Sequence, residues 1–332
     1  MKSKDDTRSN STEYGFGGRL SSVFPSQIIV DLTEVCNLEC IHCPHPTFKK
    51  SKYYSGKFLD QDLNRKIVDE VRQHGRNHTS FIRYTGEGEP LIHPKGYELI
   101  QYAVNNSGVF VTLTTNGTIM DETRTKRLLD SGVHLIDISI DAINPETYSK
   151  IRVKGNLSVT NTNVNNLIKW IRERSYETKV VVTFIEQPLN KHEVDEFKSY
   201  WINQGAHTVA IRNLHSAAGA VVNIAKSMRE SQEQEVRRSC VYPWERIILT
   251  PRGHLAFCPA DWTHGSSIAD YNTTTVEMTW KSKFYSELRY AHISNNFANH
   301  LFCGQCPDWK QTRWPNSGRS YADLIDEISN EQ

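Results

Sequence analysis

The sequence lacks the features of several large protein classes. No apolar run approaches the roughly 18 residues that a membrane-spanning helix needs, and residues 1–24 are polar and serine-rich, unlike a signal peptide. Its charges nearly cancel, with 39 Lys and Arg against 38 Asp and Glu, so no strongly basic face for nucleic acid is expected. We therefore expect a cytoplasmic protein that has neither a membrane nor a nucleic acid as partner.

Cysteine is scarce, and its number is odd. An extracellular disulfide framework would leave one of the seven cysteines unpaired, whereas clustered thiols in a reducing compartment more often bind metal. The thiols fall into two groups that are far apart in the chain. The groups are Cys36, Cys40 and Cys43, and then Cys240, Cys258, Cys303 and Cys306.

No G-x-G-x-x-G follows a predicted strand, which argues against an open nucleotide-binding sheet. Instead, a short β-branched run, a loop and an amphipathic stretch recur six times between Ser26 and Leu214. This repeat predicts an α/β fold with parallel strands, a partial (β/α)6 TIM-type barrel. The predicted strands are 27–31, 80–84, 109–114, 135–139, 179–184 and 208–211, and the predicted helices are 60–74, 95–105, 121–131, 159–174 and 191–204.

The chain is expected to divide into five segments. Two are folded domains, because the repeat stops near Leu214 and the region that follows the next charged run is rich in Trp and Pro and contains four cysteines. Within the tail, Tyr321–Ile328 is expected to form a helix that packs back on the body. The segments are a flexible arm (1–25), the barrel (26–215), a linker or bridging helix (216–238), a small metal-stapled domain (239–312) and a tail (313–332).

The first cysteine group forms a C-x3-C-x2-C loop directly after the first predicted strand. Three thiolates can hold three irons of a cubane cluster, which leaves the fourth iron open to another ligand. A structural zinc site would need four ligands, and His42 or His45 could supply the fourth. The spacing alone leaves both metals open.

Further motifs follow the next strands in order. Tyr84-Thr-Gly-Glu-Gly-Glu-Pro90 follows the second strand, Thr114-Thr-Asn-Gly117 the third, and Ser139-Ile-Asp141 the fourth, with Arg152 beyond it. Together with the cysteine loop, these motifs resemble the signature of the radical S-adenosylmethionine (SAM) superfamily over residues 27–212.

The resemblance implies a [4Fe–4S] cluster on Cys36, Cys40 and Cys43 that binds SAM, and a flavodoxin- or ferredoxin-type electron donor. His42 stands where the family commonly has an aromatic residue, and Gly88 is expected to let the backbone approach SAM closely. The residues that the resemblance places around SAM are His42, Gly86, Gly88, Glu89, Thr115, Asn116, Ser139, Asp141 and Arg152. Glu186 and Gln187 follow the fifth strand and are candidates for hydrogen bonds to SAM or the substrate.

The second cysteine group has the pattern Cys240-x12-Gly253-x4-Cys258, followed later by Cys303-x2-Cys306. It resembles the SPASM/Twitch domains that follow the barrel in many radical SAM enzymes, and the shorter Twitch form fits its four cysteines better. The first pair is expected to lie on a hairpin that turns at Gly253. Four cysteines suffice for one fully ligated [4Fe–4S] cluster, and a zinc ribbon is the alternative.

Full ligation leaves the auxiliary cluster without a vacant iron, so we expect it to accept an electron. A substrate radical at an alcohol carbon that loses one electron and the hydroxyl proton becomes a ketone. This favours dehydrogenation of a small polyol, aminocyclitol or sugar derivative. All seven cysteines would be ligands, which leaves no thiol to return hydrogen in an epimerase, and about 25 residues before the first strand are too few for a leader-recognition domain.

Three alternatives remain: a radical epimerase, a peptide-modifying maturase and, outside the class, a zinc-binding interaction protein. Arg212 and His215 follow the sixth strand, where either is a candidate base or phosphate ligand. We expect the tryptophans at 244, 262, 309 and 314 to cover the auxiliary cluster and the seam between the domains.

Overall fold

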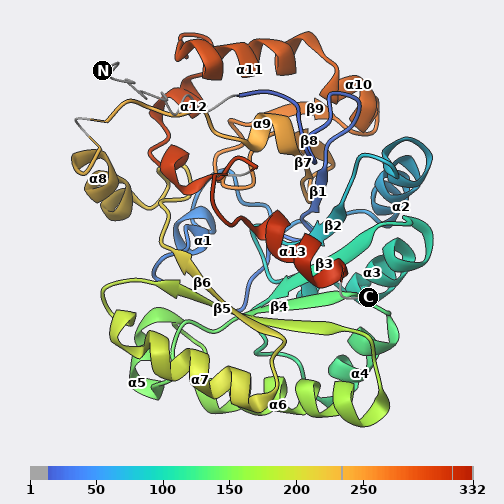
Figure 1. The fold of residues 1–332 in the computed structure, drawn as a ribbon, viewed down its shortest axis with the longest axis vertical. Coiled ribbons are helices and arrows are strands. Elements are labelled where there is room, and N and C mark those ends of the chain that lie inside the picture. Colours follow the sequence, from blue (N-terminus) through green and yellow to red (C-terminus); the bar gives the residue numbers. More distant parts are fainter. Residues whose placement is uncertain (1–13, 233–234, 316, 331–332) are drawn as a thin grey trace, which may run out of the picture.

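The computed structural model describes residues 14–232, 235–315 and 317–330, and these form one curved sheet with helices on its outer side (Figure 1). Among these residues, nine strands follow the order β6-β5-β4-β3-β2-β1-β7-β8-β9. Strands β1 to β6 are parallel, which confirms the predicted α/β partial barrel. The strands are β1 Gln27–Val30, β2 Phe81–Tyr84, β3 Phe110–Thr115, β4 Leu135–Ser139, β5 Lys179–Glu186, β6 Thr208–Asn213, β7 Arg246–Leu249, β8 His254–Ala256 and β9 Ser267–Asp270.

Two helices begin at aspartate caps, Asp60 for α2 and Asp121 for α4. The Asp60 carboxylate accepts from the Asp62 amide at 2.7 Å, and the Asp121 carboxylate accepts from the Arg124 amide at 2.9 Å. The helix predicted over 60–74 instead stops at Glu70 and continues as a π-helical turn, Val71–Gly75. The helices are α1 His45–Phe48, α2 Gln61–Glu70, α3 Gly96–Asn106, α4 Glu122–Asp130, α5 Pro145–Ile151, α6 Leu157–Arg174, α7 Val194–Gln204, α8 Val222–Glu230, α9 Tyr242–Glu245, α10 Val276–Trp280, α11 Lys283–Ser294, α12 Leu301–Gln305 and α13 Tyr321–Ser329.

The sheet continues into the C-terminal region. Strand β7 pairs in parallel with β1, and β8 then returns antiparallel to β7. Gly253 lies in the turn between β7 and β8 with a φ of 80°, a left-handed conformation that favours glycine. The predicted hairpin is therefore confirmed, and one sheet joins the barrel strands to the cysteine-rich region.

Helix α13 covers one end of the barrel. It lies at the centre of Figure 1 (red), and its apolar face packs on the first residues of β2, β3 and β4, which are Phe81, Phe110 and Leu135. A larger core fills the space between the sheet and the outer helices. Because α13 occupies the end where the strands begin, the carboxyl ends of the strands are left for a functional site.

No helix in the described part of the chain combines the length and the apolar character needed to cross a membrane.

Candidate functional site

The loop after β1 carries the first three cysteines, and all seven cysteines of the chain are free. Burial raises the pKa of the Cys36 and Cys43 thiols to about 12, and the neighbouring thiols add to the shift. The pKa of Cys40 is also raised by burial, although Arg152 opposes the shift. Thiolates at these positions therefore need a positive partner such as iron.

Backbone hydrogen bonds dock this loop on the end of helix α5. The Glu39 amide donates to the Val153 carbonyl and the Ile41 amide to the Ile151 carbonyl, both at 3.0 Å. The loop is also closed internally, because the Cys43 amide donates to the Cys40 carbonyl at 3.1 Å. The position of the three thiols thus depends on residues that follow the fourth strand.

Arg152 and Asp141 form a buried ion pair beside the loop, at 2.6 Å between Nη2 and Oδ2. The guanidinium also lies 3.6 Å from the Cys40 sulfur. Burial lowers the pKa of Arg152, but the Asp141 and Cys40 charges more than compensate, so its pKa is raised overall. Asp141 is a left-handed residue with φ of 68°, and its Oδ1 accepts from the Ile185 amide at 2.7 Å.

His42 points toward the same pair. Its Nε2 lies 3.7 Å from Asp141 Oδ2, and burial lowers its pKa to about 4, so the ring is neutral at pH 7. Gln187 is buried, and its Nε2 lies 3.5 Å from His42 Nδ1, whereas the Glu186 side chain is exposed. Of these two neighbours, Gln187 is the one that reaches the cysteine loop. Ser139 ends β4 and pairs with Thr183 of β5.

Glu89 joins the loops that follow β2 and β3. Its Oε1 accepts from Thr115 Oγ1 at 2.6 Å and its Oε2 from the Asn116 amide at 2.8 Å. The Asn116 side chain donates in turn to Asn37 Oδ1 at 2.9 Å, next to Cys36. Burial raises the pKa of Glu89, and these hydrogen bonds oppose the rise. Glu89 therefore positions the cysteine loop through Asn116.

Gly86 and Gly88 are required by packing within the chain. A Cβ on Gly86 would lie 1.9 Å from the Asp31 carboxyl carbon, and one on Gly88 would lie 2.3 Å from the Thr33 carbonyl oxygen. These contacts give both glycines a steric role that does not involve a ligand. Their predicted contacts with SAM stay predictions.

We expect Gly88→Ala to weaken the site that the cysteine loop forms. The new methyl group would meet the backbone oxygens of Thr33 and Val35, at 2.3 and 2.4 Å, and the loop must shift to make room. Iron per chain in reconstituted protein should fall from about eight toward about four. Gly17→Ala is the matched control, since no atom lies within 4 Å of a Cβ there. Unchanged iron in the Gly88 variant would contradict this role.

The four later cysteines lie on both sides of the hairpin in the chain, because Cys240 precedes β7 and the other three follow β8. Burial raises the pKa of Cys240 to about 11 and that of Cys306 to about 12, and the Cys240 charge adds to the shift of Cys306. Burial also raises the pKa of Cys258 and Cys303. Arg237 donates to the Cys303 and Gly304 carbonyls, which places one cation beside this cluster of thiols.

Three of the four tryptophans are buried and Trp262 is half-buried, and their cover of the auxiliary cluster stays a prediction. Trp244 and Trp314 contact each other with ring centroids 5.0 Å apart, and Trp314 donates to the Ser239 carbonyl next to Cys240. Trp262 lies 5.3 Å from the Phe48 ring of α1, across the seam between the two regions. Trp309 is buried.

The two candidate bases have different surroundings. Arg212 Nη2 donates to Asp137 Oδ2 at 2.6 Å inside the barrel, so its charge is already paired. His215 is exposed and within electrostatic range of His42, and its Nδ1 accepts from the Ala217 amide at 3.1 Å. The neutral His215 ring therefore carries its proton on Nε2 and presents a donor. A base role for either residue stays a prediction.

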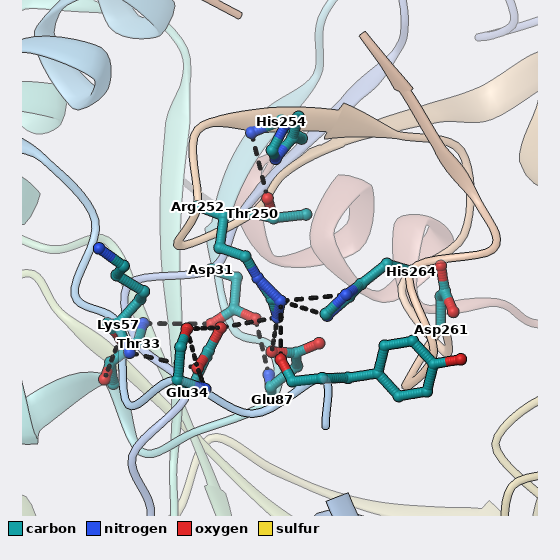
Figure 2. A network of polar contacts seen from close by, with 12 residues as sticks. Asp31, Thr33, Glu34, Lys57, Glu87, Thr250, Arg252, His254, Asp261 and His264 are labelled. Atoms are coloured by element: carbon teal, nitrogen blue, oxygen red, sulfur yellow. Dashed lines mark hydrogen bonds and ion pairs between the residues drawn. The ribbon is translucent and has the colours of Figure 1, made fainter. Parts of the chain in front are cut away.

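A cavity of about 290 Å³ opens on the inner face of the sheet, where β1 meets β7 and β8. Figure 2 shows the polar network beside it, in which the Arg252 guanidinium lies between Glu34 on one side and His264 on the other. Arg252 pairs with Glu34 at 2.6 Å and lies 3.7 Å from Glu87. No sequence motif singles out Arg252, Glu34 or His264, although Glu87 lies inside the motif that follows β2.

Comparison with known proteins identifies the two regions. Residues 30–199 match the Radical SAM superfamily, and residues 240–307 match an iron-sulfur cluster-binding domain, SPASM.

The chain belongs to the radical SAM superfamily.

Individual proteins that resemble this chain share only a small fraction of identical residues with it. The tungsten-containing aldehyde ferredoxin oxidoreductase cofactor-modifying protein of Pyrococcus furiosus is 26% identical over 190 residues, which are 56% of this chain and 51% of that protein. The chain thus spans about half the length of this curated relative. The structure of BtrN with AdoMet and 2-DOIA superposes with a TM-score of 0.56 at 15% identity, over 85% of this chain and 92% of BtrN.

A second structure shares the fold. Streptococcus suis SuiB bound to the precursor peptide SuiA has a TM-score of 0.62 at 14% identity, over 92% of this chain and 73% of SuiB. Both likenesses confirm a radical SAM barrel followed by an auxiliary domain.

The residues present fit the cofactors of the superfamily. A radical SAM domain binds a [4Fe–4S] cluster and SAM, and the SPASM domain binds auxiliary iron–sulfur. Three thiols share one loop beside the Arg152 guanidinium, and four more interact with one another in the second region. In the described residues, no three Cys, His, Asp or Glu side chains form a site for one single metal ion. The two family matches replace the zinc-protein alternative by iron–sulfur sites in both regions.

Proposed function

We propose that this enzyme removes a hydrogen atom from a small polyol, aminocyclitol or sugar derivative and oxidises the resulting radical through the auxiliary cluster. Cys36, Cys40 and Cys43 would hold the SAM-binding cluster, and Cys240, Cys258, Cys303 and Cys306 the auxiliary one. The cluster held by the first three thiols would supply, when reduced, the electron for cleavage of SAM that generates the hydrogen-abstracting radical. A flavodoxin- or ferredoxin-type donor and a cytoplasmic location belong to the same proposal.

One observation carries this proposal. The cavity is lined by Gly86 and Glu87 of the motif after β2 and also by Cys258 of the auxiliary group. A molecule bound there would contact both the motif predicted to bind SAM and Cys258 of the auxiliary group, so hydrogen removal and electron transfer are possible from one position. The cavity volume of about 290 Å³ is near the lower limit for small-molecule sites, about 300 Å³.

The fold comparison gives limited support for a small substrate. BtrN, whose structure holds AdoMet and 2-DOIA, is covered over 92% of its length. SuiB, whose structure holds the precursor peptide SuiA, is covered over 73%. A peptide maturase is therefore the rival that the experiment must test, together with an epimerase.

The protein itself must exclude water and hold the substrate in place. The cavity floor is apolar, formed by Ile29, Ile248 and Ala256, which pack as one small cluster. Its polar groups lie on the loops, with Arg252 and Glu87 facing the same space. This arrangement leaves one polar side on which hydroxyl or amino groups of a substrate can be oriented.

The double variant Cys303→Ala/Cys306→Ala tests the oxidation. We expect deoxyadenosine formation to continue while ketone product falls by about tenfold or more, because the substrate radical loses its electron acceptor. Both products are measured by mass spectrometry after anaerobic reaction with a panel of polyols, aminocyclitols and sugars.

The other outcomes identify the rivals. Solvent deuterium at a carbon of an otherwise unchanged substrate would indicate an epimerase, and turnover only on an added peptide would indicate a maturase. Ketone formation that is undiminished in the double variant would refute electron transfer through the auxiliary site. The variant that lacks Cys36, Cys40 and Cys43 serves as the control, since it should form neither product.

A further inference from the structure

The polar side of the cavity has more carboxylates than cations. Asp31, Glu87 and Asp261 line it, with Arg252 as the facing guanidinium and His254 and His264 as the facing imidazoles. The Arg252 guanidinium forms an ion pair with Glu34 at 2.6 Å. Glu34 is a fourth carboxylate, and it is not among the residues that line the cavity. When its carboxyl groups are ionised, the cavity therefore has a net negative charge.

Most of these carboxylates have donors of their own. Asp261 accepts from the amides of Thr263 and Ser266, at 2.9 and 2.6 Å. Asp31 accepts from the amides of Thr33 and Glu87, at 3.3 and 2.8 Å.

Glu87 is the exception. Its side chain is 10% exposed, yet no group in the described part of the chain donates a hydrogen bond to its Oε2. The nearest cation, Arg252, lies 3.7 Å from that oxygen, beyond hydrogen-bond distance. Burial and the neighbouring Asp31 charge both raise the pKa of Glu87. A buried acceptor without a donor is costly unless a ligand supplies one.

Glu87 lies apart from the predicted SAM contacts that follow β4 and β5. Asp141 and Arg152 follow β4, and Gln187 follows β5. The cavity instead lies over β1, β7 and β8, on the other side of β2 in the strand order. A ligand at Glu87 would therefore lie toward the auxiliary domain.

We propose that this cavity binds the substrate through a primary ammonium group, which donates to Glu87 and is flanked by Asp31. An ammonium group supplies both the missing donor and the missing positive charge. The apolar floor of Ile29, Ile248 and Ala256 would contact the carbon skeleton. This inference rests on the proposed function and narrows its substrate class to amino-substituted polyols or sugars.

Binding without turnover tests the inference. Reconstituted enzyme with SAM bound and without reductant is titrated with two matched pairs of probes, glucosamine with glucose and an inosamine with inositol. In at least one pair the amine should bind about tenfold more tightly than its neutral partner. Glu87→Gln keeps the side-chain size but removes the charge, so this preference should disappear.

Glu173→Gln is the matched control. Glu173 is half exposed on α6 and pairs with Lys169 at 3.8 Å, so the amine preference should persist in this variant. Iron content and SAM affinity are measured for each protein, to show that the sites are intact.

Three results would overturn the inference: no preference for either amine in the wild type, a preference that survives in Glu87→Gln, or a loss of SAM affinity in that variant equal to the loss of amine affinity. The last result would assign Glu87 to the amino group of SAM.

Turnover is assayed separately. Ketone formation from a neutral polyol without amine preference would refute only this inference, and amine binding without any oxidised product would refute only the proposed function.

Discussion

Replacing Cys36, Cys40 and Cys43 together by alanine should abolish deoxyadenosine formation and lower the iron content from about eight to about four per chain. The three thiols lie on one loop whose geometry is fixed by backbone bonds to residues 151 and 153. Without them SAM has no cluster to bind. Iron and sulfide are measured after anaerobic reconstitution, with deoxyadenosine measured in the same samples.

The remaining four irons are the informative part of this experiment. They would show that Cys240, Cys258, Cys303 and Cys306 hold a cluster that does not depend on the SAM site. If the wild type instead binds about four irons and the variant none, the later cysteines hold no iron–sulfur cluster. The proposed oxidation would then lose its electron acceptor.

Asp137→Asn should lower the free energy of unfolding by about 3–5 kcal/mol, a large fraction of the stability of most proteins. Asp137 is fully buried on β4, where it accepts from Arg212 at 2.6 Å, from Arg83 at 3.2 Å and from Thr183 at 2.6 Å. Asparagine would leave the charges of the two guanidinium groups uncompensated, and its amide nitrogen would replace an acceptor with a donor, either toward them or toward the Thr183 hydroxyl.

Chemical unfolding under anaerobic conditions gives the change in free energy. Asp130→Asn is the control, because Asp130 lies on the exposed surface at the end of α4 and its carboxylate accepts only from the Tyr176 hydroxyl among the bonds described. Its substitution should change stability by less than about 0.5 kcal/mol. A similarly small change for Asp137 would mean that Arg83 and Arg212 do not need its charge. Their contacts with the Tyr321 ring, at 3.7 and 5.0 Å, would then be the more important interactions.

The motifs after the strands illustrate how far local sequence can lead. Their order predicted which loops surround the cysteine loop, and the structure does bring Glu89, Asn116, Asp141 and Arg152 toward it. It also shows these residues contacting one another, which the motifs do not reveal. Glu89 accepts a hydrogen bond from Asn116, and Arg152 forms an ion pair with Asp141. Both pairs therefore position the cysteine loop independently of any ligand.

Gly88 has a steric role that its motif alone does not reveal. The sequence suggested that the glycine admits a cofactor, because glycine commonly permits close approach of a backbone. The structure shows the backbone of residues 33 and 35 in the space that a side chain would fill. No pattern within the motif could distinguish these reasons, since both require only the absence of a Cβ.

The sequence by itself determined the superfamily, the two groups of cysteines and the parallel barrel, because each depends on short spacings or on the local periodicity of strands and helices. Only the tertiary structure decided that the hairpin extends the barrel sheet beside β1 and that Arg252 meets Glu34 and Glu87. These contacts join segments far apart in the chain, and the sequence near each partner is ordinary turn or strand sequence. Their pairing follows from the shared edge of the sheet and from the burial of charge, which are properties of the folded chain as a whole.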